Sequence, residues 1–155
     1  MLPKYLIAFF VSMVPLIELR GAVPVAIDMG IEPLRALLIC AVANMVPVPI
    51  IYFFARKFLL WGAKQKHIGK ICTFFVEKGE RAGQKLVKKT GRGGLFMALL
   101  LFVGIPVPGT GAWTGTLAAS FLNMGFKSTV VSVSLGVLLA GIIMGTASLA
   151  VFGIF

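Results

Sequence analysis

Two ionisable side chains, Glu18 and Arg20, lie close together within a strongly apolar part of the chain. Ionisable groups inside apolar segments are costly, so they are functional candidates by default. A carboxylate such as Glu18 can take up a proton or bind a cation. The guanidinium of Arg20 is a permanently charged fork suited to phosphate or carboxylate. We predict that Glu18 binds a coupling ion and that Arg20 binds an anionic substrate. The alternative is a structural pair that holds a turn of the chain.

A second polar cluster lies in the stretch Leu95–Phe126, which carries no charged residue. The cluster offers hydroxyl groups, glycine backbone and one indole, from Thr110, Gly111, Trp113 and Thr114. A helix that begins near Ala112 would also direct its N-terminal amides at this cluster, and such amides are a favourable site for an anion. We therefore predict that the cluster binds substrate together with Arg20. The alternative role for Trp113 is packing against lipid.

Asn44 is the third candidate. It precedes Pro47-Val48-Pro49 inside a long apolar run, and prolines leave backbone carbonyls free in the preceding helical turn. We predict that Asn44 faces Glu18 and Arg20 and contributes to substrate binding. A hydrogen bond between helices is an equally simple role for this residue.

Motifs of enzymes and of metal sites are missing from the sequence. It has no glycine elbow around a serine, no Walker phosphate loop and no His-Glu-x-x-His zinc pattern. His67 is the only histidine, and it stands among lysines without further metal ligands. We expect a protein that is not an enzyme and that uses no cofactor and no metal.

The composition is that of an integral membrane protein. Hydrophobic residues make up 59% of the 155 residues and charged residues only 13%, and the mean hydropathy is +1.00. These values exclude an ordinary soluble domain and a disordered chain. We predict one membrane domain over residues 1–155, in which 1–55 and 94–155 are apolar halves and 56–93 is a basic linker.

Each apolar half combines short interrupted segments with one long run. Tyr5–Ile17 would be a helix of about 20 Å, which is too short to cross about 30 Å of hydrocarbon. Ala36–Ala55 and Ser128–Phe155 are long enough. Prolines and glycines mark the predicted breaks in the short segments, at Pro15, Gly21, Pro24, Pro106, Pro108 and Gly109.

These features predict an all-α integral membrane protein with two inverted repeats. Each repeat would be a re-entrant helical hairpin followed by a long transmembrane helix, since paired interrupted segments mark the binding site of inverted-repeat transporters. The equally weighted alternative is that each hairpin is a kinked spanning helix, which gives four ordinary spans. Lys127 would lie on the cytoplasmic side in the first topology and outside in the second, which favours hairpins.

The linker holds most of the positive charge. Eleven of the 15 basic residues lie between Arg56 and Arg92, opposed there only by Glu77 and Glu80. The positive-inside rule predicts that this segment is cytoplasmic and contacts anionic lipid headgroups, not nucleic acid. An apolar stripe at helical spacing also predicts an amphipathic helix on the membrane surface. The stripe consists of Ile68, Ile71, Cys72, Phe75 and Val76.

Two stretches resemble the small multidrug export protein family: Glu18-Leu19-Arg20-Gly21-Ala22-Val23-Pro24 and Ile105-Pro106-Val107-Pro108-Gly109-Thr110-Gly111-Ala112-Trp113-Thr114-Gly115. That family is similar in layout to the DedA superfamily, whose members have paired re-entrant hairpins and are associated with moving lipid-linked phosphates. Glu18 and Pro24 match the first DedA hairpin motif. The arginines of the second DedA hairpin have no counterpart here.

We therefore expect a multi-pass inner-membrane protein, a homodimer that works as an ion-coupled secondary transporter of an anionic substrate such as a lipid-linked phosphate. Four short membrane elements are few to enclose a polar path, which is the reason to expect two copies. One alternative is export of cationic drugs, in which Glu18 would bind the substrate. Another is a membrane scaffold or scramblase without ion coupling.

Overall fold

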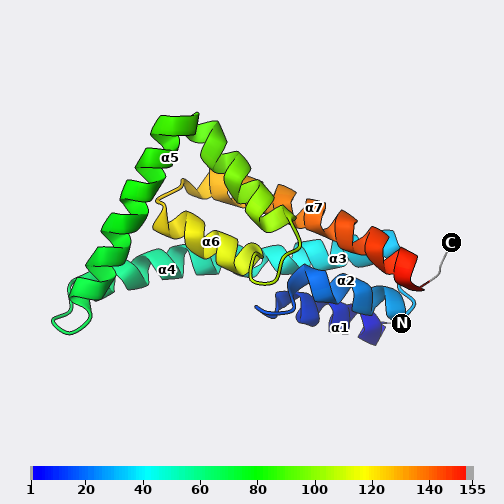
Figure 1. Cartoon of the computed structure of the whole chain (residues 1–155). Helices are drawn as coiled ribbons and strands as arrows, with labels where there is room; N and C mark the ends of the chain where they lie inside the picture. The colour runs from blue at the N-terminus through cyan, green and yellow to red at the C-terminus, as the bar shows by residue number, and fades with distance from the viewer. Residues whose placement is uncertain (1, 153–155) are drawn as a thin grey trace.

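The computed structural model describes residues 2–152, and all the regular structure in that range is helical (Figure 1). The helices are α1 (Leu2–Met13), α2 (Glu18–Asp28), α3 (Pro33–Met45), α4 (Pro47–Ala63), α5 (Gly69–Gly104), α6 (Ala112–Phe121) and α7 (Phe126–Phe152). The expected all-α class is confirmed.

Two long apolar rods form the frame of the molecule. The first, Pro33–Ala63, is α3 and α4 joined end to end over 31 residues, and the second is Phe126–Val151 over 26 residues. Both are long and apolar enough to cross a membrane. They run in opposite directions in Figure 1, and α3 packs against α7. The helical hydrogen-bond pattern of the first rod is interrupted at Val46, where Pro47 has no amide to donate and the Val46 amide bonds to the Ala43 carbonyl at 3.3 Å.

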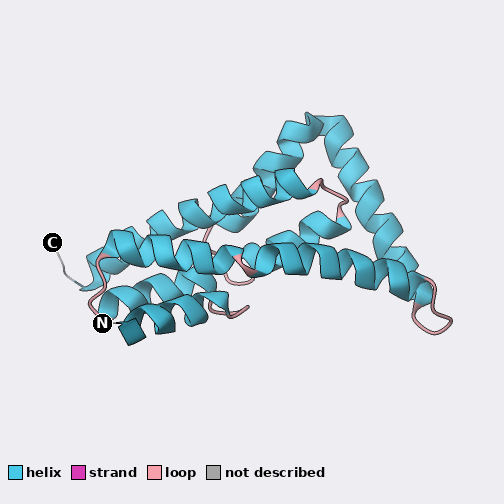
Figure 2. Ribbon diagram, turned by 180° about the vertical axis from the view of Figure 1, so that it is seen from behind, coloured by secondary structure: helices cyan, strands magenta, loops and turns pink. Residues whose placement is uncertain are grey.

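Two short hairpins lie against the rods. In the first, α1 and α2 pack together after a tight turn at residues 14–17. In the second, the end of α5 and α6 are joined by a loop at residues 105–111. The two turns face each other near the middle of the molecule, as the loops in Figure 2 show. Pro15 lies in the first turn and Pro106, Pro108 and Gly109 in the second, as predicted.

The first break is shorter than the sequence suggested. Gly21 and Pro24 lie inside α2, so the prediction that they belong to the break is wrong. The helix continues because one face of it, with Leu19 and Val23, is fully buried in the core, and tertiary packing of a helix face can override the local preference of proline to interrupt a helix. Gly21 is needed for packing, since a side chain there would meet Ile17 at 2.5 Å.

Helix α5 consists of two arms that meet at Gly91. This residue has φ 73° and ψ 177°, a conformation that glycine adopts readily. The first arm, residues 69–90, crosses one end of the bundle, and the second arm, residues 92–104, returns toward its centre (Figure 1). The bend therefore separates the basic part of α5 from its apolar part.

The predicted helix in the linker is present; contact of its apolar stripe with the membrane surface stays a prediction, and the helix packs on the rest of the protein through another face. Ile71 is 59% exposed and Phe75 49% exposed, whereas Cys72 is buried. The first arm instead approaches the end of α6 through Gly79 and Gly83. A side chain at Gly79 or Gly83 would overlap the backbone carbonyl of Phe121 or Leu122. Close contact through glycine, which a hydrophobic stripe does not reveal, sets this face.

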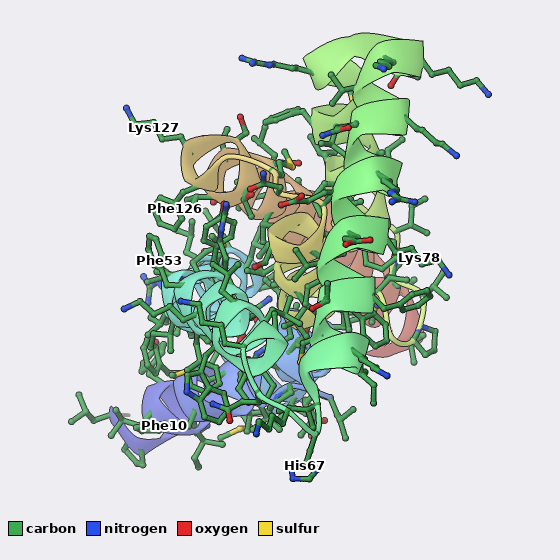
Figure 3. The ribbon with its side chains drawn as sticks, turned by 90° about the vertical axis from the view of Figure 1, so that its left-hand side faces the viewer. Phe10, Phe53, His67, Lys78, Phe126 and Lys127 are labelled. Atoms are coloured by element: carbon green, nitrogen blue, oxygen red, sulfur yellow. The ribbon has the colours of Figure 1, made fainter. Side chains whose placement is uncertain are left out.

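Positive charge collects at the end of the molecule crossed by the first arm of α5. The basic side chains of residues 56–92 are exposed there, apart from the half-buried Arg56. Figure 3 views this end and shows Lys78 and Lys127 pointing outward. The start of α1 and the end of α7 lie at the opposite end (Figure 2). The two ends of the rods therefore differ strongly in charge.

Candidate functional site

Glu18 is the first residue of α2 and bonds to the start of α6. Its carboxylate accepts hydrogen bonds from the backbone amides of Ala112, at 3.1 Å, and Trp113, at 3.2 Å. The residue is 6% exposed, and its φ of 49° is unusual for a residue other than glycine. The first amides of a helix have no partner within the helix and carry partial positive charge. Glu18 therefore caps a helix that lies in the other hairpin.

Arg20 binds at the C-terminal end of α5, in the other hairpin. Its guanidinium donates to the carbonyls of Val103 and Ile105, each at 3.2 Å, to the carbonyl of Val107, and to the hydroxyl of Thr110 at 2.9 Å. These acceptors belong to the last turn of α5 and the loop that follows. Helix C-termini present carbonyls without amide partners and carry partial negative charge, so a fixed cation is favourable there.

The two charged residues thus tie the first hairpin to the second without binding each other. Among the described residues, ion pairs join Glu32 with Arg35 and Glu77 with Arg81, and Glu18 and Arg20 are not joined. Each of the two instead compensates one end of the interrupted helix pair. Glu18 and Arg20 therefore have a structural role, because they connect two segments about 90 residues apart in the chain.

A cavity of about 380 Å³ lies between the two turns. Its volume is at the lower end of the range for small-molecule sites. Its walls come from both turns and from Met144 of α7, and Glu18 and Arg20 are its charged lining residues. The remaining walls are largely apolar and include Leu16, Ile17, Pro106 and Pro108. The cavity therefore has one charged region, at Glu18 and Arg20, within walls that are otherwise largely apolar.

Asn44 is buried next to this site, with 1% of its surface exposed. It lines a separate cavity of about 10 Å³ together with Glu18, Arg20 and Gly111. Asn44 therefore lies beside the two charged residues, and its role in substrate binding stays a prediction. Within the described part of the chain its Oδ1 has no hydrogen-bond partner, which is unusual for a buried acceptor.

Gly111 is a glycine because of Glu18. A Cβ atom at this position would overlap the Glu18 carboxylate. The close approach lets the carboxylate reach the amides that follow Gly111 in the chain. The Gly111 amide itself donates to the hydroxyl of Thr114 at 2.9 Å.

The other predicted substrate residues are placed unequally around the cavity. Arg20, Gly111 and Thr114 line it. Thr110 lies behind Arg20 and holds the guanidinium. Trp113 contributes its backbone amide to Glu18, but its side chain does not line the cavity, and its buried indole nitrogen has no partner among the described residues.

Sequence reasoning missed the apolar and backbone parts of the site. Met144 lines the cavity from the last helix, and the carbonyls of Val103, Ile105 and Val107 bind Arg20. A carbonyl is present in every residue, so no residue type marks these positions. The only signal was indirect, because two prolines and a glycine predicted that the helix ends there.

A family model described as Putative small multi-drug export protein matches residues 18–143. The chain belongs to this family. The match begins at Glu18, directly after the first turn, and includes the second turn, the first rod, the linker and the second rod as far as residue 143. No curated protein and no solved structure matches the chain. Family membership and the two long apolar helices identify this small multidrug export family member as a membrane protein with helical spans. The similarity in layout to the DedA superfamily stays a prediction.

Proposed function

We propose that this small multidrug export family member is an ion-coupled secondary transporter and that its substrate, an anion, binds in the cavity between the two turns. One observation carries the proposal. Glu18 and Arg20 are the charged residues lining a cavity at the meeting point of two helix breaks. In transporters such breaks lie near the bilayer midplane and bind substrate and coupling ion.

The topology we propose has two spans and two re-entrant hairpins arranged as inverted repeats. Helix α1 has 12 residues and α6 has 10, so they extend about 18 Å and 15 Å, too little to cross about 30 Å of hydrocarbon. The basic segment and Lys127 share one end of the molecule (Figure 3). By the positive-inside rule that end is cytoplasmic, which orients a multi-pass protein of the inner membrane and places its basic segment against anionic lipid headgroups.

An anionic substrate is supported by the positive groups around the cavity. Arg20 lines it, and the α6 amides that bind the Glu18 carboxylate are themselves an anion-binding group. Leu16, Pro106 and Met144 offer apolar contact beside them. A phosphate attached to a hydrocarbon chain, as the DedA resemblance suggests, would use both kinds of surface.

A second copy of the chain would complete the site. Leu16 is 97% exposed in the first turn, and Ile105 and Val107 are about half exposed in the second. Irregular backbone at membrane depth is tolerated only where protein or a water-filled cavity covers it. A homodimer that buries these turns would meet that requirement.

Transport by purified protein in vesicles tests the proposal. The probe is a fluorescently labelled polyisoprenyl phosphate, followed across the bilayer with and without a proton or sodium gradient. We expect gradient-dependent flux that Glu18→Gln and Arg20→Ala each abolish. Lys127→Ala, at the basic end and 17 residues before the cavity-lining Met144 on α7, is the matched control and should transport normally. Normal flux in both site variants would overturn the assignment of roles.

The family description supports a second candidate, export of cationic drugs. There Glu18 would bind the substrate and Arg20 would not be required. Drug resistance that is lost with Glu18→Gln but kept with Arg20→Ala would select this function. Flux that ignores every ion gradient would instead indicate a scramblase, and no flux of any probe a scaffold.

A further inference from the structure

Asn44 Oδ1, which has no hydrogen-bond partner within residues 2–152, is a feature of the site that the proposed function does not use. Asn44 is 1% exposed, and the cavity of about 10 Å³ that it lines with Glu18 is the size of one water molecule. Buried acceptors nearly always have a donor, so one without a partner next to a titratable group calls for a state in which a donor arrives.

Glu18 becomes a donor when it is protonated. In its ionised form the carboxylate accepts two amide hydrogen bonds at the positive end of α6, and such charge-assisted bonds are stronger than bonds to a neutral acid. A neutral Glu18 carries an O–H group that must find an acceptor. The amides of Ala112 and Trp113 are donors and cannot accept it, whereas Asn44 Oδ1 can.

We propose, on the basis of the function above, that Glu18 and Asn44 form a proton switch that controls an anion site on α6. A proton taken up from water neutralises Glu18, which leaves the amides of Ala112 and Trp113 and donates to Asn44 Oδ1, directly or through one water in the small cavity. The vacated amides then bind a phosphate-type anion. When the proton leaves to water, the Glu18 carboxylate returns to the amides and displaces the anion.

The surroundings of Glu18 make the coupling ion a proton and not a metal cation. Arg20 is the other charged side chain that lines the two cavities, and its positive charge opposes a cation in so small a space. The charged groups of the other packed elements are held elsewhere. Lys4 of α1 donates to the Met29 carbonyl, Arg35 of α3 pairs with Glu32, and Asp28 is the last residue of α2. Helix α6 has no titratable side chain, the charged residue of α7 is Lys127 in its first turn, and the thiol of Cys40 on α3 contacts the Ala8 carbonyl.

The switch has a thermodynamic consequence. If the anion binds α6 only when Glu18 is neutral, then anion binding must favour protonation of Glu18 by the same factor. The midpoint pH of the Glu18 titration should therefore rise when the anion is present. A transporter built this way moves proton and anion together.

Trp113 provides the readout, because its amide is one of the two that Glu18 releases. In a Trp61→Phe background Trp113 is the one remaining tryptophan, and its fluorescence can be titrated with pH in phosphatidylcholine vesicles. We expect a single-proton transition that Glu18→Gln removes. Asn44→Leu should lower the midpoint by about one pH unit, a tenfold weaker proton binding, while Asn44→Ser, which keeps an acceptor, should lie near the parent. Thr129→Val removes a buried hydroxyl that donates to the backbone carbonyl immediately before α7, eight residues before the first α7 residue to line the small cavity, and should leave the midpoint unchanged.

The anion is then added in two forms, inorganic phosphate in solution and phosphatidic acid in the vesicle. A raised midpoint with either supports the switch, and the form that raises it identifies a soluble or a lipid phosphate as the source. The switch would be overturned if the transition persists in Glu18→Gln. It would also be overturned if Asn44→Leu does not change the midpoint pH, or if neither form of phosphate changes it. Gradient-dependent transport without this fluorescence transition would contradict the switch but support the proposed function. The fluorescence transition without transport would support the switch but contradict the proposed function.

Discussion

The two hairpins of this protein use opposite means to place charge at the same point. The first has a turn of four residues at 14–17, and its charges are side chains, Glu18 and Arg20. The second has a longer loop at 105–111 without charged residues, and its charges are the free ends of α5 and α6. Each hairpin alone would leave unpaired polar groups in an apolar region. The comparison shows that the site is a property of the contact between them.

Loss of Arg20 should have the largest effect on this contact. Arg20→Ala removes a charged donor from three carbonyls and from the Thr110 hydroxyl, which should lower the free energy of unfolding by about 2–3 kcal/mol. Unfolding in mixed detergent micelles, followed by circular dichroism, measures the loss. Arg20→Lys keeps the charge but not the planar fork and should recover only part of it. An unchanged unfolding curve for Arg20→Ala would show that the hairpins are held by apolar packing alone.

Gly111→Ala tests the same contact from the second hairpin. The new methyl group would overlap the Glu18 carboxylate and push it from the α6 amides, at a cost of about 1–3 kcal/mol. Because both changes break one interaction, the double variant with Glu18→Gln should be less destabilised than the sum of the two singles. Strict additivity in the same unfolding assay would mean that Gly111 and Glu18 act independently.

Glu18→Gln is the milder change on the side of the first hairpin. It keeps the shape of the side chain but replaces an ionised acceptor with a neutral one at the start of α6. The expected loss of stability is about 1 kcal/mol at neutral pH. Transport in the vesicle assay should lose its dependence on the proton gradient at the same time. A variant that stays gradient-dependent would remove Glu18 from the coupling role.

An effect on stability no larger than that of Glu18→Gln, and without an effect on ion coupling, is expected from the loop of the second hairpin. Gly109 has φ 86° and open space around it, so Gly109→Ala should cost about 1 kcal/mol through backbone strain alone. Gly125 has equally open space but no positive φ, and Gly125→Ala is the matched control that should show no loss. Equal unfolding midpoints for the two variants would indicate that the loop adapts without strain.

Several features of the fold could be predicted from the sequence. Apolar composition identified the membrane class, and uninterrupted runs located the two rods. Pro15, Pro106 and Pro108 marked the two turns because a proline lacks the amide that a helix needs. Gly21 and Pro24 misled the prediction of the first break, because burial of Leu19 and Val23 outweighed local propensity.

The sequence by itself determined which side chains could carry charge within the apolar halves, since residue type and hydropathy are local properties. Only the tertiary structure decided what those charges meet. Glu18 binds amides 94 and 95 residues away, and Arg20 binds carbonyls at the end of α5 and in the loop that follows. Asn44 lies beside both, and its Oδ1 has no partner among the described residues. The physical reason is that amides and carbonyls occur in every residue. They become specific partners only where a helix ends, and only the packing of the two hairpins brings those ends within reach.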